Sequence, residues 1–456
     1  MWDNQLRDIE DLKRLNNQLG LSVQVQEDIS VLANPVHAGK LLIPNSLAIH
    51  PMEGCDGDSQ GRPGELTLRR NKRFAAGGAG LIWVEATAVV PEGRANPRQL
   101  WINDNNKDDF AAMVSMMRQT AAENFGKNHK PVIVLQLTHS GRYSKPEKGS
   151  QPIIPQHDPY RDPLIPQPVP DPNRPAKIPI DWPIVTDEYL DNIQDDYVKA
   201  ASLAYEAGFD AVDIKSCHGY LINELFASHN RQGKYGGSFE NRTRFLLETI
   251  DRIHNKLGND AVVTTRLGIY DGIPYPYGWG VDKEDYTKPD LTEPIKLVQL
   301  LHNCGVELIN ITIANPYYNP HLNRPFDKPV PGGYEEPEHP LIGVNRLIDL
   351  AGQVQKQFPN MAVVGSGYSW LKTLFPNVAA ANISNGLTTL VGGGRMAFAY
   401  PDFVKDILQN GKMDSKKVCI SCSLCTQIMR ENGMTGCAIR DKEVYGKILK
   451  QLKENT

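Results

Sequence analysis

The chain has 456 residues, of which 40% are hydrophobic and 22% charged, and a formal net charge of −4 at pH 7. This length can bury a large core, and the slightly acidic balance gives no electrostatic basis for binding nucleic acid or an anionic membrane surface. No apolar run reaches the roughly 18 to 20 residues that a membrane span needs. The charged and amide-rich N-terminus predicts a surface helix rather than a signal peptide, so we expect a cytoplasmic protein.

Eight short apolar segments recur along the chain, and helix-like stretches such as 197–208 and 240–258 lie between them. Because these segments are rich in β-branched residues and leucine, they predict strands buried on both faces. The segments are 41–49, 80–89, 131–139, 209–216, 261–268, 306–314, 361–367 and 387–395. Eightfold alternation of strand and helix predicts an α/β fold, the (β/α)8 TIM barrel, with a doubly wound sheet as the alternative.

The chain divides into three predicted parts: an N-terminal helical extension at 1–30, the barrel at 31–410, and a cysteine-rich segment with a charged terminal helix at 411–456. Long connections rich in proline, tyrosine and glycine follow three of the predicted strands, at 143–186, 268–293 and 315–340. They leave the carboxyl ends of these strands. We therefore expect them to cover an active site, with surface decoration as the alternative.

The segment that begins at Lys215 places a cation, an imidazole and a phenol where the fourth strand ends. Titratable groups at this end of a barrel strand are typical of catalytic sites. The segment resembles the signature of the old yellow enzyme family, which are flavin-dependent oxidoreductases on a (β/α)8 barrel. The matching positions are His218, Gly219, Tyr220, Leu221, Phe226, Asn230, Arg231, Tyr235, Gly236, Gly237, Ser238, Glu240, Asn241 and Arg242. Lys215 differs, because the family usually has His or Tyr there.

The resemblance implies catalytic roles for Lys215, His218 and Tyr220. In the family, the residues at the first two positions bind the carbonyl oxygen of the substrate, and the tyrosine donates a proton. The charge of Lys215 would suit an anionic substrate or the flavin, whereas pairing with Glu53 or Glu85 would make the lysine structural. The implied activity is reduction of the activated C=C bond of a small α,β-unsaturated carbonyl or carboxylate compound.

The resemblance also implies an FMN site at the strand ends. Gln136 would present its amide to the pyrimidine edge of the flavin, and Arg266 would place a cation near N1. Glycine turns after the last two strands are a common phosphate site in barrels, and Arg395 would add a charged contact. The turn positions are Gly365, Gly367 and Gly394, and the positions against the ring are Pro51, Met52, Glu53 and Ala86. His139 and Arg142 match a further family signature.

Four of the seven cysteines cluster near the C-terminus: Cys419, Cys422, Cys425 and Cys437. In a chain without a secretion signal, such a cluster favours metal binding over disulfides. It resembles the iron–sulfur segment of the subgroup that contains 2,4-dienoyl-CoA reductase and trimethylamine dehydrogenase, with the second gap one residue shorter. The resemblance implies a 4Fe–4S cluster beside the flavin, and a tetrahedral zinc ion is the alternative occupant.

No G-x-G-x-x-G motif lies between a predicted strand and helix. We therefore expect either that NAD(P)H reduces the flavin directly or that a separate electron-transfer protein delivers electrons through the cluster. Two other interpretations stay open. One is a dehydrogenase of an amine or a similar substrate that passes electrons to a carrier, and the other is a non-redox barrel that binds phosphate compounds and holds zinc. We also expect the chain to form homo-oligomers.

Overall fold

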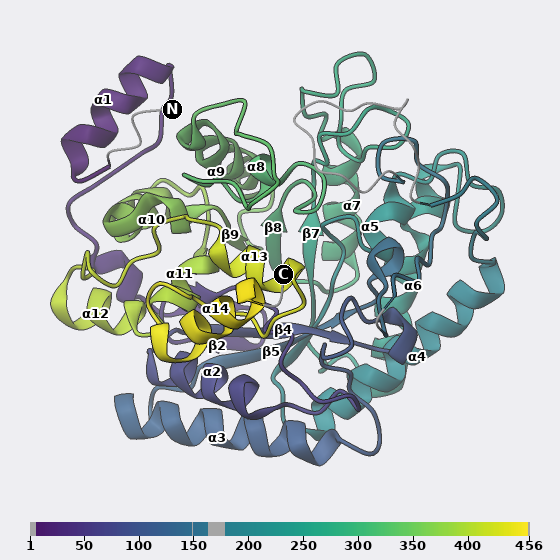
Figure 1. Cartoon of the computed structure of the whole chain (residues 1–456), viewed down its shortest axis with the longest axis horizontal. Coiled ribbons are helices and arrows are strands. Elements are labelled where there is room, and N and C mark those ends of the chain that lie inside the picture. The colour runs from purple at the N-terminus through teal and green to yellow at the C-terminus, as the bar shows by residue number, and fades with distance from the viewer. Residues whose placement is uncertain (1–5, 148, 163–177, 455–456) are drawn as a thin grey trace.

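The computed structural model describes residues 6–147, 149–162 and 178–454. Within these residues, eight parallel strands close into a barrel in the order β10–β3–β4–β5–β6–β7–β8–β9 (Figure 1). The strands are β3 (Leu47–Ile49), β4 (Leu81–Ala88), β5 (Val132–Thr138), β6 (Ala211–Ile214), β7 (Val263–Gly268), β8 (Leu308–Thr312), β9 (Ala362–Gly365) and β10 (Leu390–Gly393). The predicted (β/α)8 barrel is confirmed.

All residues of these eight strands are buried, because side chains fill the barrel on one face and helices cover the other. This two-sided burial explains why the strands appear in the sequence as continuous apolar runs. The outer helices are α2 (Glu65–Ala76), α3 (Lys107–Phe125), α4 (Asp187–Glu206), α6 (Phe239–Leu257), α7 (Thr292–Asn303), α9 (Pro340–Gln357), α10 (Phe375–Ser384) and α12 (Phe403–Asn410).

The first predicted strand, 41–49, is divided in the structure. Its beginning, β2 (Leu41–Ile43), pairs in antiparallel fashion with β1 (Val36–Ala38), and only β3 enters the barrel. Between the two strands, the side-chain oxygen of Asn45 accepts a hydrogen bond from the backbone N–H of Gly80 (3.0 Å). A polar side chain that bonds the backbone competes with a continuous strand. The prediction of a single strand at this position is therefore wrong.

Shorter elements lie at the barrel ends and in the terminal segments. They are α1 (Ile9–Leu19), α5 (Leu221–Phe226), α8 (Pro320–Asn323), α11 (Arg395–Ala399), α13 (Leu424–Arg430) and α14 (Lys447–Glu454), with 3₁₀ helices at Ser30–Ala33, Pro91–Gly93, Gly141–Tyr143 and Tyr368–Leu374 and a π-helix at Lys442–Gly446. The C-terminal segment, yellow in Figure 1, crosses in front of the barrel. Residues of its helix α13 line the cavity at the carboxyl ends of the barrel strands. No helix in the described ranges is long and apolar enough to span a bilayer.

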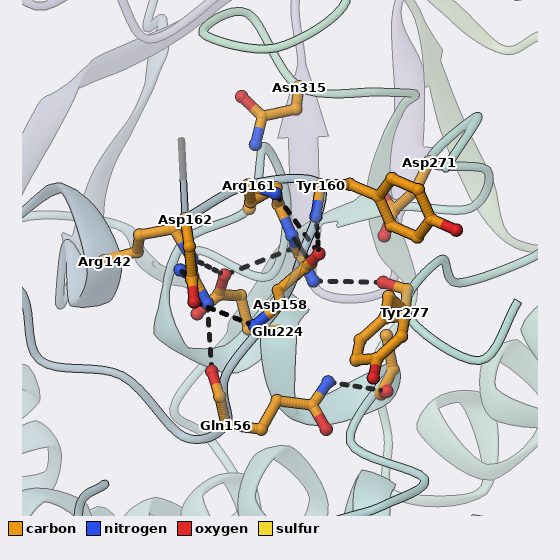
Figure 2. Close-up of polar contacts among 12 residues, drawn as sticks. Arg142, Gln156, Asp158, Tyr160, Arg161, Asp162, Glu224, Asp271, Tyr277 and Asn315 are labelled. Atoms are coloured by element: carbon orange, nitrogen blue, oxygen red, sulfur yellow. Dashed lines mark hydrogen bonds and ion pairs between the residues drawn. The ribbon is translucent and has the colours of Figure 1, made fainter. Parts of the chain in front are cut away.

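A buried network of charges anchors the start of the long connection after β5 (Figure 2). Arg142 donates to Glu224 on α5 (2.5 Å) and forms an ion pair with Asp162. Arg161 donates to the carbonyl oxygen of Tyr277 (3.0 Å), in the connection after β7. Removing one partner of a buried ion pair leaves an uncompensated charge, so this network holds both connections in place. Residues 163–177 of the first connection lie outside the described residues.

Candidate active site

A cavity opens at the carboxyl ends of the barrel strands, and most of the predicted site residues line it. The space between its walls is about 1190 Å³. We call it the main cavity. The predicted residues that line it are Pro51, Met52, Glu53, Gln136, Lys215, His218, Tyr220, Arg266, Gly367, Gly394 and Arg395. Ala86 and Gly365 are not in its wall: the carbonyl oxygen of Ala86 accepts a bond from Gln99 (3.0 Å), and Gly365 lies against the ring of Tyr368.

Tyr220 and Lys215 meet at the carboxylate of Glu53. Lys215 Nζ lies 3.1 Å from Glu53 Oε1 and 3.6 Å from the centroid of the Tyr220 ring. The hydroxyl of Tyr220 donates to the same Oε1 (3.3 Å) and lies 3.1 Å from the hydroxyl of Tyr317. Burial and the nearby Glu53 charge raise the pKa of Tyr220 well above its usual value. The phenol therefore stays protonated at neutral pH, as a proton donor must.

Of the two predicted partners of Lys215, only Glu53 pairs with it. Glu85 instead forms a buried ion pair with Arg70 and accepts a bond from the backbone N–H of Gly54 (2.9 Å). The Lys215–Glu53 pair does not remove the lysine from the site, because both side chains line the main cavity.

His218 follows β6 in the left-handed backbone region, with φ 67°. The next residue, Gly219, has φ 71°, and a Cβ there would lie 2.2 Å from the side-chain nitrogen of Asn315, so only glycine fits. His218 Nε2 lies 3.0 Å from Asn323 Nδ2 and 3.1 Å from the hydroxyl of Thr312. Burial and the charges of Arg266 and Lys215 hold the pKa of His218 well below its usual value. The imidazole is neutral and can donate one hydrogen bond.

Gln136 and Arg266 are both oriented by Asp213 on the strand between them. Gln136 Nε2 donates to Asp213 Oδ2 (2.6 Å), and the backbone N–H of Arg266 donates to Oδ1 (2.6 Å). Burial raises the pKa of Asp213 to about 6. Arg266 Nε is buried without a hydrogen-bond partner among the described residues. A buried unpaired donor is costly, so this end of the cavity fits a polar, electron-rich ligand edge such as the flavin pyrimidine.

At the other end of the cavity, two arginines approach the glycine turn after β10. Arg395 Nη2 donates to the carbonyl oxygen of Pro325 (2.7 Å), and its Nη1 is buried without a partner. Burial and the charge of Arg395 lower the pKa of Arg324 to about 9. In the described part of the chain, no carboxylate pairs with either guanidinium. Two such cations beside Gly394 fit the phosphate of FMN.

The four clustered cysteines surround a smaller space of about 380 Å³, which we call the cysteine cavity: Cys419, Cys422, Cys425 and Cys437 line it. Burial raises the pKa of Cys437 to about 12. Arg395, Phe398 and Cys425 line both this cavity and the main cavity. Among the residues that the structure describes, no three Cys, His, Asp or Glu side chains form a group that could hold a metal ion.

Several residues of the main cavity were not predicted. Two of the three long connections take part in the site: 315–340 supplies Tyr317, Asn323 and Arg324 to the main cavity, whereas Tyr143, from the connection after β5, lines a neighbouring one. The tail supplies Thr426, Met429, Arg430 and Thr435, and the end of β3 supplies His50. His50 precedes the predicted Pro51, so its position was open to prediction, whereas the tail residues carry no local signal.

The two further signature residues, His139 and Arg142, lie outside the wall of the main cavity. Arg142 belongs to the buried network of Figure 2. His139 Nε2 lies 2.9 Å from the hydroxyl of Tyr189, and burial lowers the pKa of the imidazole to about 3. Both residues therefore hold the connection after β5 in place.

Comparison with known proteins identifies the family to which the chain is similar. The model of the NADH:flavin oxidoreductase / NADH oxidase family matches residues 31–283. The chain is 29% identical over 287 residues to an NADPH dehydrogenase of Bacillus cytotoxicus, covering 61% of this chain and 70% of that protein. An NADPH dehydrogenase of Bacillus velezensis is 30% identical over 287 residues, covering 61% of this chain and 72% of that protein.

Solved structures share the fold at lower sequence identity. A complex of 2-naphthoyl-CoA reductase has a TM-score of 0.68 and 17% identity, covering 93% of this chain and 58% of that chain. An old yellow enzyme homologue of Zymomonas mobilis has a TM-score of 0.59 and 21% identity, with coverage of 84% and 94%. Histamine dehydrogenase of Rhizobium has a TM-score of 0.66 and 19% identity, with coverage of 93% and 53%. The chain thus spans little more than half of the first and third of these proteins.

Proposed function

The chain belongs to the NADH:flavin oxidoreductase / NADH oxidase family, and on that premise we propose that it reduces the activated C=C bond of α,β-unsaturated carbonyl or carboxylate compounds. The family makes it an FMN-dependent oxidoreductase. The observation that carries the proposed reaction is the position of the Tyr220 phenol. The phenol stays protonated beside Lys215 and His218. The same cavity is lined by Gln136 and Arg266, the proposed contacts of the flavin.

The side chains of this site have complementary tasks in such a reduction. Bound FMN supplies a hydride for the β-carbon of the substrate. Lys215 and the neutral imidazole of His218 donate hydrogen bonds to the substrate oxygen, where negative charge develops. Tyr220 gives its proton to the α-carbon, which completes the saturated product. Arg266 would stabilise the negative charge of reduced flavin.

We further propose that the cysteine cavity holds a 4Fe–4S cluster, as in the subgroup of 2,4-dienoyl-CoA reductase and trimethylamine dehydrogenase. The supporting observation is that all four cysteines line one cavity, and four thiolates are the ligand set that a 4Fe–4S cluster requires. Cys425 lines both cavities, so a cluster there would lie beside the FMN site. NAD(P)H is the proposed direct donor, because the relatives are NADPH dehydrogenases, and the cluster offers a second entry for electrons from a carrier protein.

The charge of the main cavity favours this reaction over oxidation of an amine. Lys215, Arg266, Arg324, Arg395 and Arg430 line the cavity, whereas Glu53 is its single carboxylate among the described residues. With Arg266, Arg324 and Arg395 assigned to FMN, Lys215 and Arg430 still outnumber Glu53, so the cavity would repel a cationic amine and would not repel a carbonyl or carboxylate substrate.

The test is an anaerobic spectrum of the purified protein, with flavin and iron analysis, followed by two mixing experiments. NAD(P)H should bleach the flavin absorbance, and 2-cyclohexenone should restore it in the reduced protein. A flavin that is bleached by amines and not reoxidised by enones would instead support the dehydrogenase. A colourless protein that contains zinc and no iron would support the non-redox barrel.

A further inference from the structure

A second cavity reaches the reacting centre from the side of the tail. This outer cavity, with about 730 Å³ between its walls, shares Glu53, Tyr317, Met429 and Arg430 with the main cavity. Its wall also includes Ser150, which is exposed, so the outer cavity communicates with bulk water. Tyr220 lines only the main cavity. The Tyr220 side chain is buried, and its hydroxyl reaches the outer cavity only through the neighbours that line both cavities.

We propose that Glu53 relays protons from the outer cavity to Tyr220 after each turnover. This inference rests on the proposed reduction, in which Tyr220 loses its proton to the substrate. Glu53 Oε1 accepts the hydrogen bond of the Tyr220 hydroxyl at 3.3 Å, and the carboxylate belongs to the walls of both cavities. The relay is thus a single side chain that accepts a hydrogen bond from the phenol and lines the outer cavity.

The proton steps balance without a further reactant. When the Tyr220 O–H bond breaks, a C–H bond forms at the α-carbon of the substrate and a phenolate is left behind. A hydronium ion or a buffer acid in the outer cavity protonates the Glu53 carboxylate and leaves water or the conjugate base of the buffer in the solvent. The new O–H bond of Glu53 then breaks, the Tyr220 O–H bond forms again, and the carboxylate is restored. Burial strongly disfavours the phenolate, which drives the last transfer.

Two neighbours are less suited to this task. The hydroxyl of Tyr317 lies 3.1 Å from that of Tyr220 and also lines the outer cavity. However, burial and the Glu53 charge raise the pKa of Tyr317, so a relay through it requires a second buried phenolate. The ammonium of Lys215 lies over the face of the Tyr220 ring, 3.6 Å from its centroid, and is paired with Glu53. Its position orients the carboxylate.

The experiment compares Glu53→Gln with wild type in the FMN-loaded enzyme, using 2-cyclohexenone as the probe. Glutamine keeps an acceptor for the Tyr220 hydroxyl but cannot carry a proton. In anaerobic stopped-flow mixing, the first reoxidation of reduced flavin should stay within about threefold of wild type, because Tyr220 begins protonated. Later turnovers should slow by roughly 10²-fold. The time course should therefore show a burst, in which each enzyme molecule forms one product molecule rapidly and the next ones slowly. Formate should restore the later turnovers in the variant and leave wild type unchanged.

A spectroscopic signature accompanies the burst. In Glu53→Gln, the ultraviolet absorbance of tyrosinate should rise with the first turnover and decay when formate is added. Glu53→Asp keeps a carboxyl group and should lose the burst, and Tyr317→Phe, which removes the competing hydroxyl, should retain wild-type later turnovers. Equal slowing of first and later turnovers in Glu53→Gln, absence of formate rescue, or a burst in Tyr317→Phe alone would overturn the relay. A wild-type flavin that is reduced but not reoxidised by the enone would overturn the proposed function itself, and the relay with it.

Discussion

Arg324 Nη1 donates a 2.9 Å hydrogen bond to Thr426 Oγ1, which joins the connection after β8 to the cysteine-bearing tail. The neighbour of Thr426 in the chain, Cys425, lines both the main cavity and the cysteine cavity. Arg324 lies beside Arg395, near the glycine turn after β10. The tail therefore forms part of the wall of the main cavity, the proposed FMN site, and a ligand in either cavity should influence the other.

The first prediction concerns the two arginines at the proposed phosphate site. Arg324→Met and Arg395→Met should each weaken FMN binding by about 10- to 100-fold, because a hydrogen bond to a charged group contributes roughly 1.5–3 kcal/mol. Titration of the apoprotein with FMN, followed by quenching of flavin fluorescence, measures the affinity. Arg118→Met, at a surface pair with Asp210, is the matched control and should bind FMN as wild type does. Unchanged affinity in both cavity variants would place the phosphate elsewhere.

The second prediction concerns the cysteine cavity. Anaerobic preparations should contain about four irons per chain, as one 4Fe–4S cluster requires. Cys422→Ser should lose most of this iron and keep the flavin spectrum, because Cys422 lies outside the wall of the main cavity. Cys304→Ser, at the end of α7, is the control and should retain the iron. Stoichiometric zinc in place of iron would remove the redox role of the tail.

The third prediction concerns Tyr220. Tyr220→Phe should slow reoxidation of the flavin by the enone roughly 10²–10⁴-fold, the usual contribution of a positioned acid. Reduction by NAD(P)H should change little, since that step needs no proton from this side. Stopped-flow absorbance separates the two half-reactions. An equal loss in both half-reactions would show that the phenol has a structural role.

Replacement of Lys215 should have a different effect. Lys215→Met removes the charge beside the substrate oxygen, so it should weaken substrate binding and slow the reoxidation step together. The dependence of the reoxidation rate on enone concentration measures both quantities. If neither changes while the protein becomes less stable, the role of Lys215 is confined to its ion pair with Glu53.

The fourth prediction concerns Asp271, in the connection after β7. Burial raises its pKa from 3.8 to about 6, although the charge of Arg161 opposes the shift and that of Glu224 adds to it. Between these two values the folded state binds more protons than the unfolded state, so the stability of the wild type falls as pH rises through this window. Asp271→Asn has no carboxyl group at this position, so its stability does not fall for this reason.

The melting temperature of Asp271→Asn relative to wild type should therefore rise between about pH 4 and pH 6 and level off above that range. Thermal unfolding at a series of pH values measures the difference. Asp181→Asn, at an exposed position, is the control and should stay parallel to wild type across the range. A constant difference for Asp271→Asn would show that the carboxyl group titrates equally in both states.

The sequence by itself determined the barrel and the chemistry at its strand ends. A strand buried on both faces is apolar along most of its length, so each barrel strand is visible in the sequence as a continuous run of apolar residues. The first predicted strand, 41–49, is the exception, because Asn45 interrupts it. In a closed parallel barrel all carboxyl ends lie on one rim, so Gln136, Lys215 and Arg266 had to come together once the strands were assigned. Local pattern and topology were sufficient for this part of the site.

Only the tertiary structure decided which side chains pair and where the tail lies. Glu53 and Glu85 are both acidic residues near strand ends, and the choice of Glu53 as the partner of Lys215 follows from the distance between atoms on different strands. The tail residues Thr426 and Arg430 line the main cavity because α13, the helix that carries them, forms part of its wall. Such contacts join residues far apart in the chain through the packing of side chains, which no local pattern of residue types encodes.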